Sequence, residues 1–124
     1  PGQNDSIDEA KAAAAWIIEN IGSDTPVHLN AFHSNHKMEN VAQTPNSMLE
    51  RLRTVYAGAG LNYVYIGNTI SEYQNTFCPK CRSLLINRTY SFGEAINLER
   101  DGEDFVCSHC GTAVPIICPI DIDF

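Results

Sequence analysis

Two pairs of cysteines limit what this chain can fold into more than any other feature. Each pair has the spacing C-x-x-C, and the pairs occupy residues 78–81 and 107–110. Two intervening residues let both sulfur atoms of a pair face one ion, and four thiolates complete a tetrahedral shell. We therefore predict one metal site, with the ligands Cys78, Cys81, Cys107 and Cys110. Because such a shell leaves no position for water, we expect a structural site and not a catalytic one.

The identity of the ion is left open by the spacing alone. Zinc is the first choice, and iron in a rubredoxin-like geometry is the next. A disulfide or a thioredoxin-like redox motif would also use C-x-x-C, but neither explains why there are two pairs. His109 lies between two ligands and is expected to be a solvated residue, and Cys118 is expected to be a small buried apolar side chain.

Composition restricts the compartment and the partners. The cysteine count of five is odd and no segment resembles a signal peptide, so we expect a cytoplasmic protein. Eight basic and fifteen acidic residues give a net charge of -7, which argues against general binding to a nucleic-acid backbone. No apolar run approaches the length that spans a membrane, and we expect no membrane partner. At 124 residues the chain suits one domain, or a small domain with a metal module.

The first half of the chain has the pattern of an α/β fold with parallel strands. Spacing of apolar residues, capping signals and turn residues predict four elements: a helix that begins at a capping box of Ser6 and Glu9, a strand at 27–32, a helix with Thr44 as N-cap and Pro45 as first residue, and a strand at 61–66. Two parallel strands cannot form a complete sheet, because their outer edges stay unpaired. We therefore expect further strands, from an N-terminal part of the same polypeptide, from another subunit or from self-association.

The second half changes to short β segments around the cysteines. We place the domain boundary in a polar connector, which gives domains at 1–70 and 71–124. Strands are expected at 83–90 and 104–106, with a hairpin turn at 101–102 and a further strand within 113–124. A module this small buries little apolar surface, so metal binding is expected to supply much of its folding free energy, about 10–16 kcal/mol in comparable zinc peptides.

Residues that could bind a ligand follow the predicted strands. In parallel α/β folds, functional loops lie at the carboxyl ends of strands. That rule selects Asn4 and Asp5 in the N-terminal turn and His33 after the first strand. His33 could bind a heterocycle or a carboxylate, or it could cap its own loop. We expect His36 to be solvated and His28 to be a sheet-face side chain with a local partner, and we assign no catalytic residue.

Several motifs in a fixed order resemble those of a known family. They are the turn at 1–6, the segment 27–33, Lys37-Met38, Thr44-Pro45, the segment 63–68 and the two cysteine pairs. Together they resemble the C-terminal part of AmmeMemoRadiSam-type radical SAM enzymes, which are relatives of pyruvate formate-lyase activating enzymes. The resemblance covers the chain from residue 1 to about residue 112.

The resemblance implies a fold and an activity for the complete protein. Residues 1–70 would be the last part of a partial (βα) barrel, and 71–124 would be an appended β-rich zinc ribbon. Similar enzymes are oxidoreductases that bind S-adenosylmethionine and a [4Fe–4S] cluster, generate a 5′-deoxyadenosyl radical and, as activases, act on a protein substrate. Asn4, Asp5 and His33 would then line the S-adenosylmethionine side of the barrel.

One departure from the family pattern decides what this chain can do alone. The family holds its cluster with C-x-x-x-C-x-x-C, and this sequence contains no such triplet. We therefore expect that the chain alone does not cleave S-adenosylmethionine, so that any enzymatic activity belongs to the complete protein. The alternative hypothesis is a free-standing zinc-binding interaction module without catalysis. His36 stands where relatives carry an aromatic residue, which argues against a shared role for it.

Overall fold

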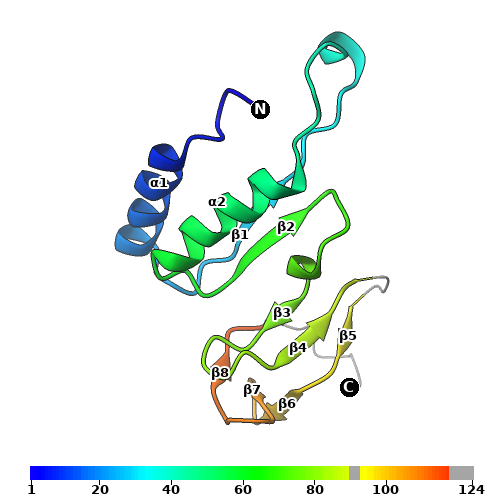
Figure 1. Ribbon diagram of the computed structural model, residues 1–124. Coiled ribbons are helices and arrows are strands. Elements are labelled where there is room, and N and C mark those ends of the chain that lie inside the picture. Colours follow the sequence, from blue (N-terminus) through cyan, green and yellow to red (C-terminus); the bar gives the residue numbers. More distant parts are fainter. Residues whose placement is uncertain (90–92, 118–124) are drawn as a thin grey trace. The chain divides into compact units, whose positions relative to one another are not determined.

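The computed structural model describes residues 1–89 and 93–117. The chain divides into two compact units, Pro1–Tyr73 and Gln74–Phe124 (Figure 1). The boundary predicted from the sequence lies a few residues earlier, between residues 70 and 71. The structure is a mixed α/β chain, with a parallel pair of strands in the first unit and antiparallel sheets in the second.

The first unit contains helices and strands in alternation. Its elements are α1 (Ile7–Asn20), β1 (Val27–Asn30), the 3₁₀ turn η1 (His36–Met38), α2 (Asn46–Gly58) and β2 (Val64–Gly67), followed by the 3₁₀ turn η2 (Glu72–Gln74) at the boundary. β1 pairs with β2 in parallel, and the register runs from Val27 opposite Val64 to Asn30 opposite Gly67. The expected order of helix, strand, helix and strand is therefore present.

Both helices pack against one face of the strand pair. Side chains alternate between faces along a strand, so Leu29 and Val64 share one face while His28 and Asn30 lie on the other. Two clusters form the core on the first face, one around Ala14, Leu61 and Val64 and one around Ala31, Leu49 and Ile66. Residues from α1 and α2 both contribute to the first cluster, and His28 and Asn30 are exposed.

The two helices begin differently. Ser6 is the N-cap of α1, and its hydroxyl accepts a hydrogen bond from the Glu9 N–H at 3.4 Å, as the capping signal predicted. Thr44 was expected to cap α2, but the cap is Pro45, which has no side-chain hydrogen bond. The Thr44 hydroxyl instead accepts from the Phe32 N–H at 3.0 Å, and the Thr44 N–H donates to the Phe32 carbonyl at 3.0 Å. The same two bonds close the loop between residues 32 and 44.

The strands of the first unit are shorter than expected. β1 ends at Asn30, since Phe32 turns toward Thr44. β2 begins at Val64 and not at residue 61, because the Leu61 N–H donates to the Tyr56 carbonyl at the end of α2 at 3.3 Å and not to a neighbouring strand. An aromatic and β-branched run therefore marked the position of β2 correctly and its start too early.

The second unit consists of two three-stranded antiparallel sheets. One sheet has the order β3-β4-β5 and the other the order β6-β7-β8. The strands are β3 (Thr76–Phe77), β4 (Leu84–Asn87), β5 (Glu94–Ala95), β6 (Leu98–Asp101), β7 (Asp104–Cys107) and β8 (Ala113–Val114). The expected hairpin joins β6 to β7, with Gly102 at a φ of +66° in the turn.

The described part of the second unit has a small apolar core. Its buried apolar side chains, among residues 74–89 and 93–117, are Leu85, Phe105 and Val114, together with the sulfur-bearing Cys78 and Cys107. Phe105 and Val114 are paired between β7 and β8. The expected strand within 113–124 is present at Ala113–Val114, and residues 118–124, with the prediction for Cys118, lie outside the described residues.

Candidate metal centre

The four cysteines of the two pairs come together in the second unit. Their sulfur atoms all lie within 4.8 Å of one another. Cys78 Sγ is 3.6 Å from Cys110 Sγ, and Cys81 Sγ is 3.6 Å from Cys107 Sγ, so the close contacts cross from one pair to the other. Cys78 and Cys107 are fully buried, while Cys81 and Cys110 are partly exposed.

The two pairs sit on backbone turns with the same hydrogen bonds. Each turn begins with a fully buried cysteine whose N–H donates to a residue five positions later: Cys78 to the Ser83 carbonyl and Cys107 to the Thr112 carbonyl, both at 2.9 Å. The carbonyl of that first cysteine accepts the N–H of the residue after the second one, Arg82 at 3.0 Å and Gly111 at 2.7 Å. The two halves of the centre are thus built alike although they come from different sheets.

The residue after each pair has a left-handed backbone. Arg82 has a φ of +64° and Gly111 a φ of +69°. Glycine adopts this conformation without steric cost, whereas a residue with a Cβ does not. Gly111 therefore suits its turn, and Arg82 is strained at the equivalent position.

A hydroxyl group lies beside one sulfur of each pair. Ser83 Oγ is 3.3 Å from Cys81 Sγ, and Thr112 Oγ1 is 3.1 Å from Cys110 Sγ. Hydrogen bonds from the Ser83 side chain and backbone lower the pKa of Cys81 to about 6, against the opposing effect of burial. The Thr112 hydroxyl and backbone likewise lower the pKa of Cys110. These two positions favour thiolates, the form that binds metal.

The buried thiol of Cys107 differs from these two cysteines. Burial raises the pKa of Cys107 to about 11, because a charged thiolate is poorly solvated there. A thiol of that kind would release its proton to solvent on binding a divalent cation, whose charge would then offset the thiolates. The centre therefore combines two thiolate-favouring positions with one that needs the ion.

The spacing of the sulfurs fits a single tetrahedral ion. A zinc–sulfur bond of about 2.3 Å places the sulfurs of a regular tetrahedron about 3.8 Å apart. The two contacts of 3.6 Å are close to that separation. All four cysteines are free, and a disulfide would require a sulfur–sulfur distance of about 2.0 Å. A [4Fe–4S] cluster binds its cysteines on four separate irons, which would hold the sulfurs further apart than these.

His109 lies within the second turn but outside the ligand group. The side chain is exposed, and the four sulfurs already complete a tetrahedral set. The residues at this centre that sequence reasoning missed are Ser83, Thr112 and Asn97. The hydroxyls had a readable signal, since Ser or Thr stands two positions after each pair. Asn97 had none: its side chain donates to the Leu84 carbonyl at 2.9 Å and its carbonyl accepts from the Ser108 N–H at 3.1 Å, which links β4 to the second turn.

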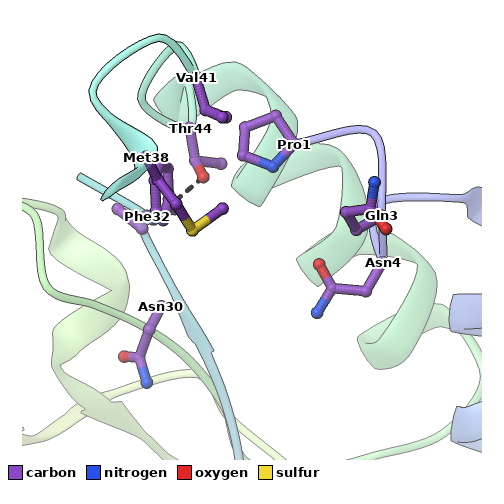
Figure 2. Close-up of a pocket in the computed structure, with 9 residues that line it drawn as sticks. Pro1, Gln3, Asn4, Asn30, Phe32, Met38, Val41 and Thr44 are labelled. Carbon is purple, nitrogen blue, oxygen red and sulfur yellow. Dashed lines mark hydrogen bonds between the residues drawn. The ribbon is translucent and has the colours of Figure 1, made fainter. Parts of the chain in front are cut away.

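The expected ligand-binding residues of the first unit are only partly brought together. Asn4 lines two hollows beside β1, of about 400 Å³ and about 140 Å³, and Asp5 lines the smaller one. Figure 2 shows the Asn4 side chain in the larger hollow, with Asn30, Met38 and Thr44 around it. Asp5 also accepts a hydrogen bond from the Gly2 N–H at 2.8 Å. Asn30, which lines both hollows, was not foreseen.

His33 takes a different position from Asn4 and Asp5. Its Nε2 is 2.6 Å from the carbonyl oxygen of Asn68, which follows β2. The Asn68 side chain in turn donates to the Ala31 carbonyl at 2.9 Å. His33 therefore ties together the loops at the carboxyl ends of β1 and β2, and it does not line either hollow. His28 stacks on Tyr65 with ring centroids 5.0 Å apart, which is the local partner that was expected.

Comparisons with known proteins give a limited result. No family model matches the chain, and no solved structure matches it. The chain is similar to an uncharacterized protein of Methanocaldococcus jannaschii, with 38% identity over 118 residues. That alignment covers 94% of the chain and 35% of the relative, so the chain spans about a third of the length of the curated relative it matches. Within the described residues, no helix is long and apolar enough to cross a membrane.

Proposed function

We propose that the chain is the C-terminal portion of a radical SAM enzyme that resembles activases of glycyl radical enzymes, with a structural zinc ion in the four-cysteine centre. The observation that carries this proposal is the pair of hollows bordered by Asn4, Asp5 and Asn30 beside β1. The carboxylate of Asp5 accepts hydrogen bonds, and the two carboxamides both donate and accept them. These groups suit the amino and hydroxyl groups of S-adenosylmethionine.

The ordered sequence motifs and the length of the relative also support the proposal. A protein about three times as long as this chain has room for a cluster-binding portion. In the complete protein the [4Fe–4S] cluster and S-adenosylmethionine would supply the radical chemistry. The residues of this chain would bind and orient the nucleoside part, and His33 would hold the two strand-exit loops through its 2.6 Å contact with Asn68.

The test is an assay of the complete polypeptide after anaerobic reconstitution of its cluster. With a chemical reductant, it should convert S-adenosylmethionine to 5′-deoxyadenosine. Asn4→Ala should raise the KM for S-adenosylmethionine about tenfold through loss of hydrogen bonds. His36→Ala, in the neighbouring loop but away from the hollows, is the matched control and should leave the KM unchanged. A complete polypeptide that lacks C-x-x-x-C-x-x-C, or that makes no 5′-deoxyadenosine when its cluster is loaded, would refute the proposal.

The choice of zinc rests on the donor set and its enclosure. Four thiolates within 4.8 Å form a closed site of the kind that zinc occupies in structural ribbons. Metal analysis should give one zinc ion per chain in a colourless sample. A red or brown sample that contains iron would instead identify a rubredoxin-like site.

A second candidate function is a free-standing zinc-binding interaction module. The formal net charge of -7 and the exposed polar face of the strand pair favour contact with another protein over catalysis. This hypothesis predicts that the 124-residue chain forms a stable complex or a dimer. A monomeric chain that is well folded in dilute solution by light scattering would count against it.

A further inference from the structure

Gly67 is a glycine whose own backbone does not explain its presence. It is the last residue of β2, and its φ lies outside the left-handed region, whereas six other glycines of the chain have a positive φ. A glycine inside a strand lowers stability, because it loses more conformational freedom on folding and has no side chain to pack. The reason for a glycine at this position therefore lies in its surroundings.

The space beside Gly67 is taken by the side chain of Asn30. The two residues are opposite each other in the parallel pair, and the neighbouring Ala31 N–H donates to the Gly67 carbonyl at 3.0 Å. Paired residues of adjacent strands point to the same face of a sheet. A Cβ at position 67 would overlap with Asn30 Oδ1 and would lie 3.5 Å from Asn30 Cγ. The Asn30 carboxamide thus extends over β2, into room that a glycine leaves free.

The contact concerns a side chain and not the fold. Asn30 Oδ1 is at the end of a rotatable side chain, so the carboxamide can turn away from a Cβ at position 67 while both strands keep their register. Gly58, at the end of α2, also lacks a positive φ, and a Cβ there would have no atom within 4 Å. Alanine at position 58 would displace nothing, whereas alanine at position 67 would redirect Asn30.

The carboxamide that Gly67 accommodates is available to a ligand. Asn30 is exposed, and its side chain makes no hydrogen bond within residues 1–89 and 93–117. The same residue lines both hollows beside β1. Figure 2 shows the Asn30 carboxamide directed away from Asn4. The two carboxamides would therefore meet different groups of one ligand.

We propose that Gly67 is a positioning residue, which holds the Asn30 carboxamide over β2 in the direction that binds S-adenosylmethionine. The inference rests on the proposed function, from which it takes the ligand. A carboxamide has its donor and its acceptor on separate atoms, and hydrogen bonds weaken steeply with misalignment. A rotation of the side chain would move both atoms away from their partners. A larger residue at position 67 would therefore weaken ligand binding without a ligand contact of its own.

The side-chain torsion angle of Asn30 tests the contact without any ligand. In the 124-residue chain, three-bond couplings measured by NMR give the χ1 angle. Gly67→Ala should shift Asn30 to a different χ1 rotamer, whereas the matched control Gly58→Ala should leave it unchanged. The melting temperature of Gly67→Ala should equal or exceed that of the original chain, because alanine loses less backbone entropy on folding.

Steady-state kinetics of the complete polypeptide test the consequence for the ligand. Gly67→Ala should raise the KM for S-adenosylmethionine about tenfold and leave kcat nearly unchanged, because the lost hydrogen bonds serve binding. Asn30→Ala should have a similar effect. Gly67→Ala added to Asn30→Ala should change the KM by less than about twofold, because no carboxamide remains to be redirected. Gly58→Ala should keep the KM of the original polypeptide.

Three results would overturn the inference. One is an unchanged χ1 angle of Asn30 in Gly67→Ala, and another is an unchanged KM in this variant when the original polypeptide is active. The third is an equally large effect of Gly67→Ala in the presence and absence of the Asn30 carboxamide, which would mean that Gly67 acts through another group. A complete polypeptide that forms no 5′-deoxyadenosine would instead refute the proposed function and with it the choice of ligand. The χ1 measurement would then decide by itself whether Gly67 orients Asn30.

Discussion

At the scale of single residues, the two hydroxyls beside the sulfurs act on the cysteines of the candidate metal centre. Ser83 is the largest cause of the lowered pKa of Cys81, which is about 6. A thiol with a low pKa competes less with protons for the metal, so the site should hold its ion to lower pH. Without the hydroxyl, the pKa of Cys81 rises, and protons displace the metal at a higher pH.

We therefore predict that Ser83→Ala weakens zinc binding. Loss of a group that supports a metal ligand typically costs about 10- to 100-fold in affinity. The midpoint of acid-induced zinc release should also move to higher pH, because more Cys81 is protonated at each pH. Competition with a coloured chelator measures the zinc affinity, and the same chelator followed during acidification measures the pH midpoint of zinc release. Ser108→Ala, an exposed serine between the ligands of the second pair, is the control, and equal affinity in the two variants would contradict the prediction.

The left-handed residues after the pairs lead to a second prediction. Arg82→Gly should stabilise the second unit by about 0.5–1 kcal/mol, because glycine relieves the steric cost at a φ of +64°. Gly111→Ala should destabilise it by about 1 kcal/mol for the reverse reason. Denaturant unfolding of the zinc-loaded chain, followed through signals of the second unit, gives both values.

Arg82→Ala separates strain from charge. Alanine removes the cation but keeps the Cβ that causes the steric cost, so this variant should stay near the stability of the original chain. If alanine stabilised as much as glycine, the relevant change would be the loss of charge in this exposed side chain and not the relief of strain.

The sequence predicted which four cysteines come together and not the residues that contact them. A C-x-x-C pair is a local pattern whose geometry follows from its own turn, so spacing was enough to group Cys78, Cys81, Cys107 and Cys110. The role of Asn97 depends on two contacts, with Leu84 and Ser108, that are distant in the sequence. No local pattern marks such a residue.

At the scale of elements, α2 holds β2 through more than apolar packing. Arg53 donates to the Val64 carbonyl and stacks on Tyr73, which fixes the segment after β2 to the helix. Because the interacting residues come from three different segments, periodicity in the sequence showed only the apolar face of α2. The cap of α2 was misassigned for a similar reason, since Thr44 bonds to Phe32 across a loop.

We predict that Arg53→Met lowers the free energy of unfolding of the first unit. The loss should be about 1–2 kcal/mol, from a backbone carbonyl without its donor and a lost cation–π contact. Methionine keeps most of the apolar length of the side chain. Arg51→Met, an exposed position on the same helix, should change the stability by less than about 0.5 kcal/mol. Equal effects in urea unfolding would show that the contacts of Arg53 contribute nothing specific.

At the scale of the whole molecule, the two units depend on different forces. The first unit has two apolar clusters beneath its helices, whereas the described residues of the second include few buried apolar side chains around four sulfurs. The order of elements in the first unit followed from the sequence, since it is encoded by local patterns, whereas in the second unit β3 and β5 were not predicted. The strands that complete the parallel sheet could not be assigned, because pairing is a property of segments far apart or on another chain.

Loss of the metal should therefore unfold one unit and spare the other. Cys107→Ser, or removal of zinc with a strong chelator, should make residues 76–112 sensitive to protease while α1 and α2 stay protected. Limited proteolysis with mass spectrometry locates the cuts, and circular dichroism should retain the helical signal. Ser108→Ala is the matched control for the substitution. Unchanged resistance of 76–112 in the serine variant would mean that the fold of this unit does not depend on its ion.

The two hydrogen bonds that close the loop between residues 32 and 44 have a practical consequence. Phe32 and Thr44 join its two ends by two hydrogen bonds of 3.0 Å. These bonds, and not the residues between them, therefore set the course of the backbone from β1 to α2. Foreign sequence inserted near Glu39 and Asn40, which are both exposed, should leave the strand pair intact. That position offers an attachment point for an epitope tag or a fluorophore.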